Sequence, residues 1–224
     1  MAMLRTRVKL AVKQVLFPVA FQFPPVVLAP ERLRLWLSAL SASADVDGDV
    51  VEIGCAFGGT AAYASSFLER TGDSRRYLAY DTFEGFVADQ FDADEPRGTG
   101  GGQREAFSAN SLSLARRVAR RHGTSSLRLV KGDICDPLLE FPPLVSACLV
   151  DVDLEEPVYV ALSRAWERLA KGGVILVDDC DGAESDWRAD EGYRRFVEEH
   201  RLPHLCRNGM GLVGGPDILD RITG

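Results

Sequence analysis

Four acidic residues follow two apolar runs in the second half of the sequence. Asp151 and Asp153 end the run SACLVDVD, and Asp178 and Asp179 end the run GGVILVDD. Neighbouring parallel strands end at one edge of a sheet, and the 27-residue separation of Asp151 and Asp178 fits one strand–helix–strand crossover. Carboxylates this close repel unless a cation neutralises them, and hard oxygen ligands favour Mg²⁺ over Zn²⁺. The spacing predicts a divalent metal site; the alternative is loop carboxylates that cap helices.

A glycine-rich turn lies in the segment VVEIGCAFGGT, which ends at Thr60 and predicts a strand, a turn and a helix. A dinucleotide site requires G-x-G-x-x-G, whereas this turn places Glu52 before Gly54, Gly58 and Gly59. A carboxylate at this position repels a pyrophosphate and suits a cationic ligand that carries a sulfonium and an ammonium group. The turn therefore indicates S-adenosylmethionine, with a purely structural turn as the alternative.

Two further acidic residues support a nucleoside site. Asp81 follows Glu52 by 29 residues, at the end of the next apolar run. An acid at this position accepts hydrogen bonds from both ribose hydroxyls. After the following run, Gly132 and Asp133 form a turn in which Asp133 either bonds the adenine amino group or is a solvated turn residue.

The elements that must position these residues alternate between short apolar runs and helical stretches, which predicts an α/β fold with a doubly wound, parallel sheet. The predicted strands cover 49–53, 77–80, 127–130, 146–151 and 173–178. The predicted helices between them cover 59–70, 108–122 and 157–170, and a last strand pair is expected within 205–215.

The alternating segments predict a domain over 49–224. The other segments predict an extension before this domain and a long loop within it. Residues 1–48 are expected to form a helical extension or cap, with helices over 4–17 and 31–40. The uncharged run Gln14–Pro30 contains four prolines, which argues against a membrane span. The acidic and glycine-rich stretch over 87–107 is expected to be a loop that closes over a ligand, or else a disordered insertion.

Composition narrows the classes of function. The chain has 224 residues with 33 acidic and 26 basic side chains, so its net charge of −7 disfavours nucleic acid as a partner. Five cysteines form no CxxC pair, which suggests neither a disulfide framework nor a zinc site and favours a reducing cytoplasm. Pro203 interrupts the metal-like spacing of His200 and His204, so both are expected to be surface residues. No G-x-S-x-G hydrolase motif is present.

Taken together, these pieces resemble the macrocin O-methyltransferase family of class I S-adenosylmethionine-dependent enzymes, which methylate sugar hydroxyls. The resemblance covers about residues 49–182, and AYDTFEGF is its most specific piece. It implies a Rossmann-like sheet with an antiparallel last strand and a homodimer or larger assembly. It also implies three groups of site residues: Glu52 and Gly54 at the methionine part, Asp81 at the ribose, and Asp151, Asp178 and Asp179 at Mg²⁺. The other candidate cofactor-binding residues are Gly58, Gly59, Thr60, Thr82, Phe83, Gly132 and Asp133.

The sequence departs from the family at two positions. The family has a basic residue where this chain has Phe57, and an aromatic residue where it has Glu155. Recognition of the acceptor and of the cofactor carboxylate is therefore expected to differ from that of typical members.

The expected reaction is an in-line methyl transfer from the sulfonium to a sugar hydroxyl, with Mg²⁺ on two neighbouring acceptor oxygens. Asp151 is the first candidate for the general base and Asp153 the second. The alternative in the same class is a Mg²⁺-dependent methyltransferase of a catechol or another vicinal diol, although the sequence shows no evident aromatic slot for a flat acceptor. Two functions from different classes are disfavoured: an NAD-linked oxidoreductase by the glycine spacing and Glu52, and a non-catalytic binding module by the four intact carboxylates.

Overall fold

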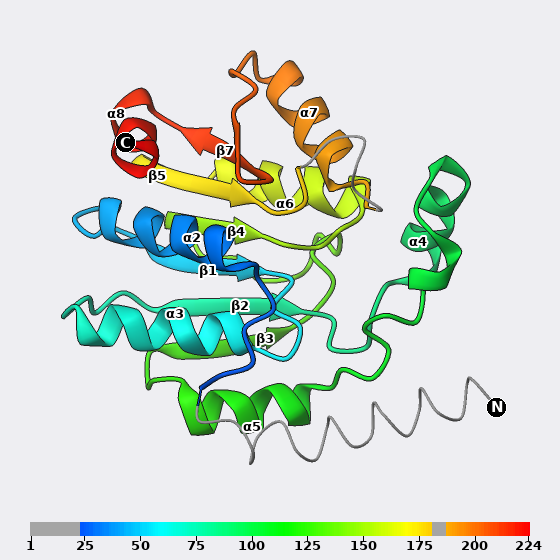
Figure 1. Ribbon diagram of the computed structural model, residues 1–224, viewed down its shortest axis with the longest axis horizontal. Helices are drawn as coiled ribbons and strands as arrows, with labels where there is room; N and C mark the ends of the chain where they lie inside the picture. The colour runs from blue at the N-terminus through cyan, green and yellow to red at the C-terminus, as the bar shows by residue number, and fades with distance from the viewer. Residues whose placement is uncertain (1–22, 181–186) are drawn as a thin grey trace.

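The computed structural model describes residues 23–180 and 187–224; the predicted helix over 4–17 falls outside these ranges. The strands are β1 Asp49–Ile53, β2 Tyr77–Asp81, β3 Leu127–Lys131, β4 Val145–Val150, β5 Leu169–Val177, β6 Cys206–Arg207 and β7 Met210–Gly214. They form one sheet of seven strands in the order β3-β2-β1-β4-β5-β7-β6 (Figure 1). The first five strands pair in parallel, whereas β7 is antiparallel to both β5 and β6. The predicted sheet, with its antiparallel end, is confirmed.

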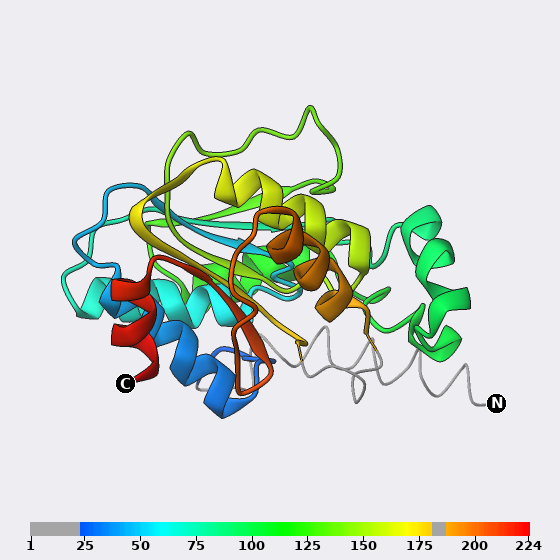
Figure 2. The ribbon, with the colours of Figure 1, turned by 90° about the horizontal axis from the view of Figure 1, so that it is seen from above.

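Helices cover both faces of this sheet (Figure 2). They are α2 Pro30–Ala42, α3 Gly59–Arg70, α4 Ala88–Asp94, α5 Leu112–His122, α6 Glu155–Trp166, α7 Ala189–Glu199 and α8 Pro216–Thr223, with short 3-10 turns η1 Glu95–Arg97 and η2 Gly101–Gln103. Neighbouring strand residues alternate between two hydrophobic clusters: Val50 faces the α2, α3 and α8 side, and Val51 faces the α6 and α7 side. Side chains on both faces are therefore buried, as the continuous apolar runs predict.

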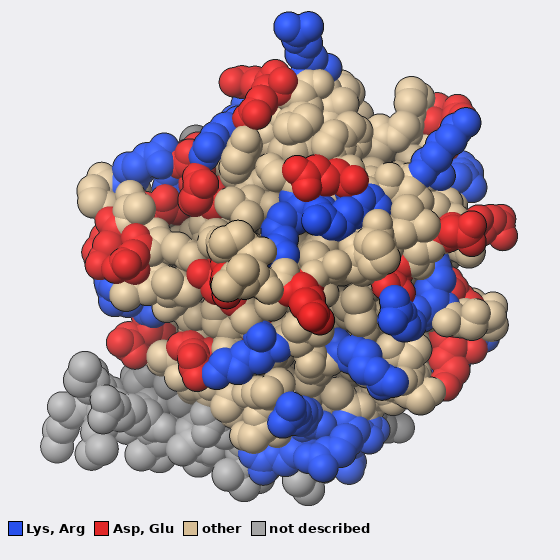
Figure 3. All heavy atoms as spheres, turned by 180° about the vertical axis from the view of Figure 1, so that it is seen from behind, with Lys and Arg blue, Asp and Glu red and all other residues tan. Residues whose placement is uncertain are grey.

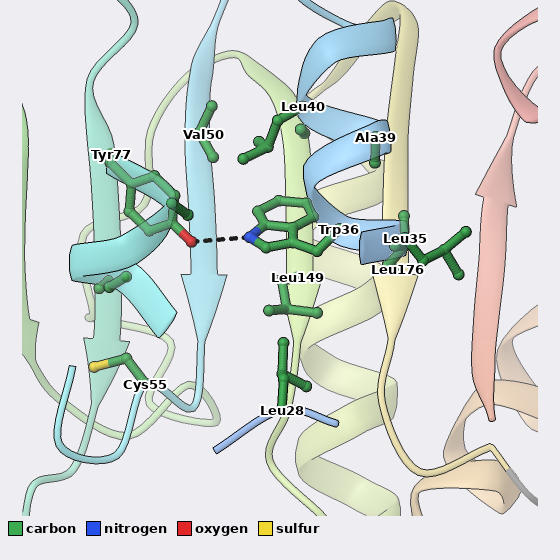
Figure 4. Close-up of a cluster of buried hydrophobic side chains, with 14 of the residues drawn as sticks. Leu28, Leu35, Trp36, Ala39, Leu40, Val50, Cys55, Tyr77, Leu149 and Leu176 are labelled. Atoms are coloured by element: carbon green, nitrogen blue, oxygen red, sulfur yellow. Dashed lines mark hydrogen bonds between the residues drawn. The ribbon is translucent and has the colours of Figure 1, made fainter. Parts of the chain in front are cut away.

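The helix α2 is part of the main core. Leu35, Trp36, Ala39 and Leu40 are fully buried, and Figure 4 shows them over the strand residues Val50, Leu149 and Leu176. The helix predicted over 31–40 is present as α2, and its apolar face covers the middle of the sheet. The remainder of the predicted extension lies mostly outside the described residues.

Several predicted boundaries are also wrong. The helix expected over 157–170 ends at Trp166, because Leu169 already pairs with Val145 of β4. The helix expected over 108–122 begins at Leu112, where the Ser111 side chain accepts a hydrogen bond from Leu114 N–H. The stretch over 87–107, expected to be a loop, contains α4, η1 and η2, and the helices α7 and α8 were not predicted.

The surface carries charges of both signs. On the face shown in Figure 3, arginines gather at the lower edge, where α5 lies. The α5 sequence LSLARRVARRH contains four arginines and no acidic residue, so α5 forms a basic strip on an acidic protein. Within the described ranges, no helix combines the length and the apolar character that a membrane span requires.

Candidate active site

The glycine-rich turn connects β1 to α3 at the carboxyl edge of the sheet. Gly54 has φ +91°, and a Cβ on it would lie 1.8 Å from the Asp151 carbonyl oxygen. Gly58 has φ +74°, which other residues rarely adopt. A Cβ on Gly59 would lie 1.9 Å from the Pro25 carbonyl oxygen. The absence of a side chain at Gly54 and Gly59 thus lets other backbone segments pack directly against the turn: the residues after β4 at Gly54, and the segment before α2 at Gly59.

Glu52 borders the cavity at this turn but is only 1% exposed. The Tyr77 hydroxyl donates a hydrogen bond to Glu52 Oε2, and Trp36 Nε1 donates to the Tyr77 hydroxyl at 3.2 Å (Figure 4). Burial raises the pKa of Glu52 to about 8, although the Tyr77 hydrogen bond opposes the shift. A cationic ligand group beside Glu52 would favour its charged form, so this buried acid is suited to an ammonium or sulfonium centre.

Asp81 is held at the end of β2 by two backbone donors. Its carboxylate accepts hydrogen bonds from Ala56 N–H at 2.8 Å and from Phe83 N–H at 2.6 Å. Burial raises the pKa of Asp81 to about 6, against the effect of these donors. The Phe83 side chain packs into the core and does not line the cavity, so Phe83 contributes its N–H group only. Thr82 lines the cavity beside Asp81.

Asp133 lies at the end of β3, and its carboxylate also has protein donors. It accepts from Gln90 Nε2 at 2.7 Å and from Cys135 N–H at 2.9 Å. Gln90 belongs to α4, so this helix forms one wall of the site. No sequence pattern pointed to Gln90, because the contact depends on the position of α4 beyond the carboxyl ends of the strands (Figure 1).

Asp151, Asp153 and Asp179 converge at the other end of the cavity. One carboxylate oxygen from each lies within 4.8 Å of the other two. Asp151 follows β4 and Asp179 follows the parallel neighbour β5, as the predicted crossover requires. Asp153 and Asp179 have positive φ values of 65° and 57°, a conformation that is costly for non-glycine residues and often occurs at functional sites.

These carboxylates lie close enough to perturb one another. Burial and the neighbouring acids raise the pKa values of Asp151 and Asp153 well above the usual range for aspartate. Burial and Asp179 raise the pKa of Asp178 to about 7, although Arg32 opposes the shift. Such a group of acids gains stability from any cation bound between them.

Arg32 of α2 already supplies one positive charge there. Its Nη1 atom lies 2.8 Å from Asp178 Oδ1 and 2.7 Å from Asp179 Oδ1. Arg32 was not among the predicted site residues, since nothing in the spacing links α2 to residues almost 150 positions away.

The chemistry of the donor set decides which metal ion could bind here. The three converging side chains offer only hard carboxylate oxygens, which suit Mg²⁺ or Ca²⁺ rather than Zn²⁺. The closest group contains Asp153 instead of the predicted Asp178, and Arg32 pairs with both Asp178 and Asp179 beside it. The residues present therefore fit a hard divalent ion.

One cavity of about 470 Å³ joins the two ends. Gly58 and Phe83 do not line this cavity. The other predicted site residues all line it: Glu52, Gly54, Gly59, Thr60, Asp81, Thr82, Gly132, Asp133, Asp151, Asp153, Asp178 and Asp179. The carboxyl edge of β1 to β5 thus brings together residues that are up to 127 positions apart in sequence.

Aromatic side chains form a wall of the cavity that no sequence pattern predicted. Phe86 packs against Phe107 and Trp187, with ring centroids 5.4 Å and 5.5 Å apart, and all three line the cavity. They come from three separate connecting segments, which explains why no aromatic slot was evident in the sequence.

Comparisons with known proteins place the chain among O-methyltransferases. The profile of the macrocin-O-methyltransferase (TylF) family matches residues 31–206. A relative from Streptomyces olivaceus, 8-demethyl-8-(2,3-dimethoxy-alpha-L-rhamnosyl)-tetracenomycin-C 4'-O-methyltransferase, is 30% identical over 166 residues. That alignment covers 69% of this chain and 63% of the relative, so the chain matches less than two thirds of the relative's length.

Solved structures share the fold at low sequence identity. The O-methyltransferase NovP superposes with a TM-score of 0.67 at 16% identity, covering 93% of this chain and 98% of NovP. The calicheamicin methyltransferase CalS11 superposes with a TM-score of 0.63 at 19% identity, covering 93% and 92% of the two chains. These similarities extend over almost the whole chain and show a methyltransferase fold.

Proposed function

Because the chain belongs to the macrocin O-methyltransferase family, we propose that it is an S-adenosylmethionine-dependent enzyme that methylates a sugar hydroxyl with the help of Mg²⁺. The observation that carries this proposal is the single cavity that joins the glycine-rich turn and Asp81 to the aspartates after β4 and β5. Direct transfer requires the donor and the acceptor to be held together in one space. The cavity provides that space.

The β1–β3 end suits the methyl donor. S-adenosylmethionine supplies a methyl group on a positively charged sulfur when it is bound. Asp81, which the N–H groups of Ala56 and Phe83 hold in place, would accept hydrogen bonds from the ribose hydroxyls. Asp133 accepts from the adenine amino group, and Glu52 balances the positive charge of the methionine part.

The β4–β5 end suits the metal and the acceptor. Asp151, Asp153 and Asp179 would hold Mg²⁺, with Asp178 as a fourth candidate ligand; Arg32 pairs with both Asp178 and Asp179. A metal ion bound there supplies a Lewis acid that makes an acceptor hydroxyl more acidic. The three carboxylates would compensate the positive charge of the metal ion. Arg32 would compensate part of the negative charge that the carboxylates have in excess of the metal.

The hydroxyl proton must pass to a base as the oxygen attacks the methyl carbon. Asp151 is the first candidate and Asp153 the second, because both line the cavity beside the proposed metal. The electron pair of the broken carbon–sulfur bond stays on sulfur, so the leaving group needs no acid. The pH–rate profiles of Asp151→Asn and Asp153→Asn separate the two candidates, because only loss of the base removes the ascending limb.

The aromatic wall of the cavity indicates which class of acceptor molecule could bind. Phe86, Phe107 and Trp187 offer an apolar surface of inclined rings in the same cavity as the carboxylates, against which the apolar face of a sugar ring can pack. The name of the Streptomyces olivaceus relative describes methylation of a rhamnosyl group, and this supports a sugar acceptor. The same wall also fits the ring of a catechol, so a catechol or another vicinal diol is the second candidate.

The test begins with calorimetric titration of S-adenosylhomocysteine, first with Mg²⁺ and then with a chelator. We expect micromolar binding in both conditions. Methyl transfer to deoxysugar glycosides and to catechols is then followed by mass spectrometry, and we expect products from glycosides only when Mg²⁺ is present. Failure to bind the nucleoside would overturn the cofactor assignment, whereas exclusive turnover of catechols would favour the second candidate.

We also propose a homodimer or larger assembly in the cytoplasm. Phe23 and Val27 are each 67% exposed beside Leu28, which lines the cavity, so an apolar surface lies close to the site. The five cysteines, all in the described part of the chain, form no disulfide, which suits a reducing compartment. Light scattering after size-exclusion chromatography measures the assembly directly.

A further inference from the structure

A second group of metal-ligating side chains lies away from the cavity, between α7 and the segment leading into β6. Asp190 belongs to α7, and His204 and Cys206 follow it in the chain. One ligand atom from each lies within 4.8 Å of the other two. His204 Nε2 is 3.7 Å from Asp190 Oδ1 and 3.7 Å from Cys206 Sγ.

The geometry distinguishes a metal site from a catalytic proton relay. In a Cys–His–Asp relay, the acid and the nucleophile contact different nitrogens of the imidazole ring. Here Asp190 and Cys206 both approach the same atom, Nε2 of His204. Zinc–ligand bonds of roughly 2.0–2.3 Å in a tetrahedron place neighbouring ligand atoms about 3.3–3.8 Å apart. The observed separations of 3.7 Å fall within that range.

Asp190 supplies an independent indication of a ligand. This residue is only 6% exposed, and among the described residues its Oδ1 atom has no hydrogen-bond partner. The other oxygen, Oδ2, accepts a hydrogen bond from Arg194 Nε at 2.6 Å. Burying an oxygen without a partner is costly, and this oxygen faces His204. A cation at the centre of the group would satisfy it.

A further thiol lies next to this group of three. Cys180 is buried, its Sγ donates to the Asp178 carbonyl at 3.7 Å, and interaction with Cys206 raises the pKa of the Cys180 thiol. Tyr193 stabilises the segment opposite: its ring lies 5.1 Å from that of His204, and its hydroxyl accepts a hydrogen bond from Leu205 N–H at 3.0 Å. His204 and Cys206 are partly exposed, so an ion can reach the group from solvent.

We propose that Cys180, Asp190, His204 and Cys206 form a structural Zn²⁺ site. Two thiolates, one imidazole and one carboxylate are ligands that Zn²⁺ accepts in tetrahedral sites, whereas Mg²⁺ avoids sulfur. The sequence spacing conceals the site, because its ligands are spread over 27 residues and contain no CxxC pair.

The position of this site gives it a consequence for the cavity. Cys180 directly follows Asp178 and Asp179, and its N–H group donates to the Gly209 carbonyl at 2.7 Å. Zinc bound there would tie the end of β5 to α7 and to the β6–β7 hairpin. It would thus hold the backbone that carries two of the active-site carboxylates.

Cobalt substitution tests the proposal, because Co²⁺ bound by thiolates absorbs strongly in the near ultraviolet. The full chain is reduced, freed of metal with a chelator, exchanged into buffer with excess Mg²⁺, and titrated with Co²⁺. We expect one equivalent to produce the thiolate charge-transfer band. The carboxylate cluster has oxygen ligands only and cannot give this band.

Variants make the assignment specific. Cys206→Ser removes an exposed ligand at little risk to folding, and His204→Gln is a second such variant; both should abolish the band. Cys135→Ser, which removes a half-buried thiol outside the group, should retain it. Zinc should also raise the thermal midpoint of the wild type and of Cys135→Ser, but not that of Cys206→Ser.

Two results would overturn the proposal. One is a reduced wild-type chain that shows no charge-transfer band at saturating Co²⁺. The other is a band that survives in both Cys206→Ser and His204→Gln. If the reduced chain binds no cobalt and mild oxidation joins Cys180 to Cys206, the pair is a redox-sensitive dithiol instead of a metal site.

Discussion

At the β1–β3 end of the cavity each acidic side chain has hydrogen-bond donors from the protein, whereas at the β4–β5 end the acids face one another. Asp81 has two backbone donors and Asp133 has a backbone and a side-chain donor. Asp151 and Asp153 instead have other carboxylates as their main electrostatic neighbours. Arg32 is the cation that partly offsets this repulsion, through Asp178 and Asp179.

This difference separates two ways of preparing a binding site. Protein donors at the β1–β3 end orient the acids for neutral hydroxyl and amino groups, so the site is formed before the ligand arrives. The β4–β5 end keeps negative charges together, which costs stability until a cation binds. Substitutions at the two ends should therefore have separable effects on the two ligands.

The largest effect is expected from Asp179→Asn. This change removes one of the three converging carboxylates, and loss of metal assistance is worth several kcal/mol. We expect kcat to fall at least about 100-fold, while the dissociation constant for S-adenosylhomocysteine changes little. Steady-state kinetics and calorimetry measure the two quantities. Turnover within tenfold of the wild type would remove the proposed metal role of Asp179.

A smaller effect, at the opposite end, is expected from Asp81→Asn. The amide has one acceptor oxygen where the carboxylate had two, and hydrogen bonds to charged groups contribute about 1.5–3 kcal/mol. We expect S-adenosylhomocysteine to bind roughly 10- to 100-fold more weakly, while Mn²⁺ binding, measured by calorimetry, stays unchanged. Asp89→Asn, an exposed change on α4 with the same loss of charge, is the matched control. Equal loss in both variants would show a general charge effect instead of ribose recognition.

A third effect tests Arg32 as the internal counter-ion. Arg32→Met leaves Asp178 and Asp179 without their positive partner, so a divalent ion no longer competes with the guanidinium. We expect Mn²⁺ to bind roughly tenfold more tightly, about 1.4 kcal/mol, and the metal-free variant to melt at a lower temperature. Arg34→Met, which alters an exposed arginine of the same helix, should change neither quantity. Unchanged Mn²⁺ affinity in Arg32→Met would show that the arginine and the metal do not compete.

At both ends, residues that follow the strands could be predicted from the sequence, whereas residues from other elements could not. Asp81, Asp151 and Asp179 end buried strands, and the parallel order of those strands is sufficient to bring them to one edge. Arg32 and Trp187 approach the same cavity from α2 and from the segment before α7, so their positions depend on tertiary packing that no local pattern records.

The fold shows the same limit. Apolar runs predicted the first five strands to within a few residues, because burial on both faces of the sheet requires apolar side chains in inner strands such as β1 and β4. The stretch over 87–107 is polar and glycine-rich, which predicts a loop, yet contacts such as the hydrogen bond from Glu155 N–H to Asp94 at 2.8 Å hold its helical turns in place. Tertiary contacts thus override local propensity in this segment.

The smallest effect concerns Glu52, whose pKa is raised from 4.5 to about 8 by burial. Between about pH 4.5 and pH 8, Glu52 keeps its proton in the folded state but has lost it in the unfolded state. The contribution of Glu52 to the free energy of unfolding is therefore complete below about pH 4.5 and is lost as the pH rises toward about 8. Between pH 6 and pH 7 this one group should lower the free energy of unfolding by about 1 kcal/mol. Glu52→Gln keeps an acceptor for Tyr77 but cannot titrate, so its stability should fall by that much less over the same interval. Urea unfolding in excess Mg²⁺, which suppresses the contribution of the β4–β5 carboxylates, isolates the β1–β3 end. Parallel profiles of unfolding free energy against pH for the wild type and Glu52→Gln would show that Glu52 does not titrate in this range. The cationic methionine part of the proposed cofactor would then bind beside a Glu52 that is already ionised.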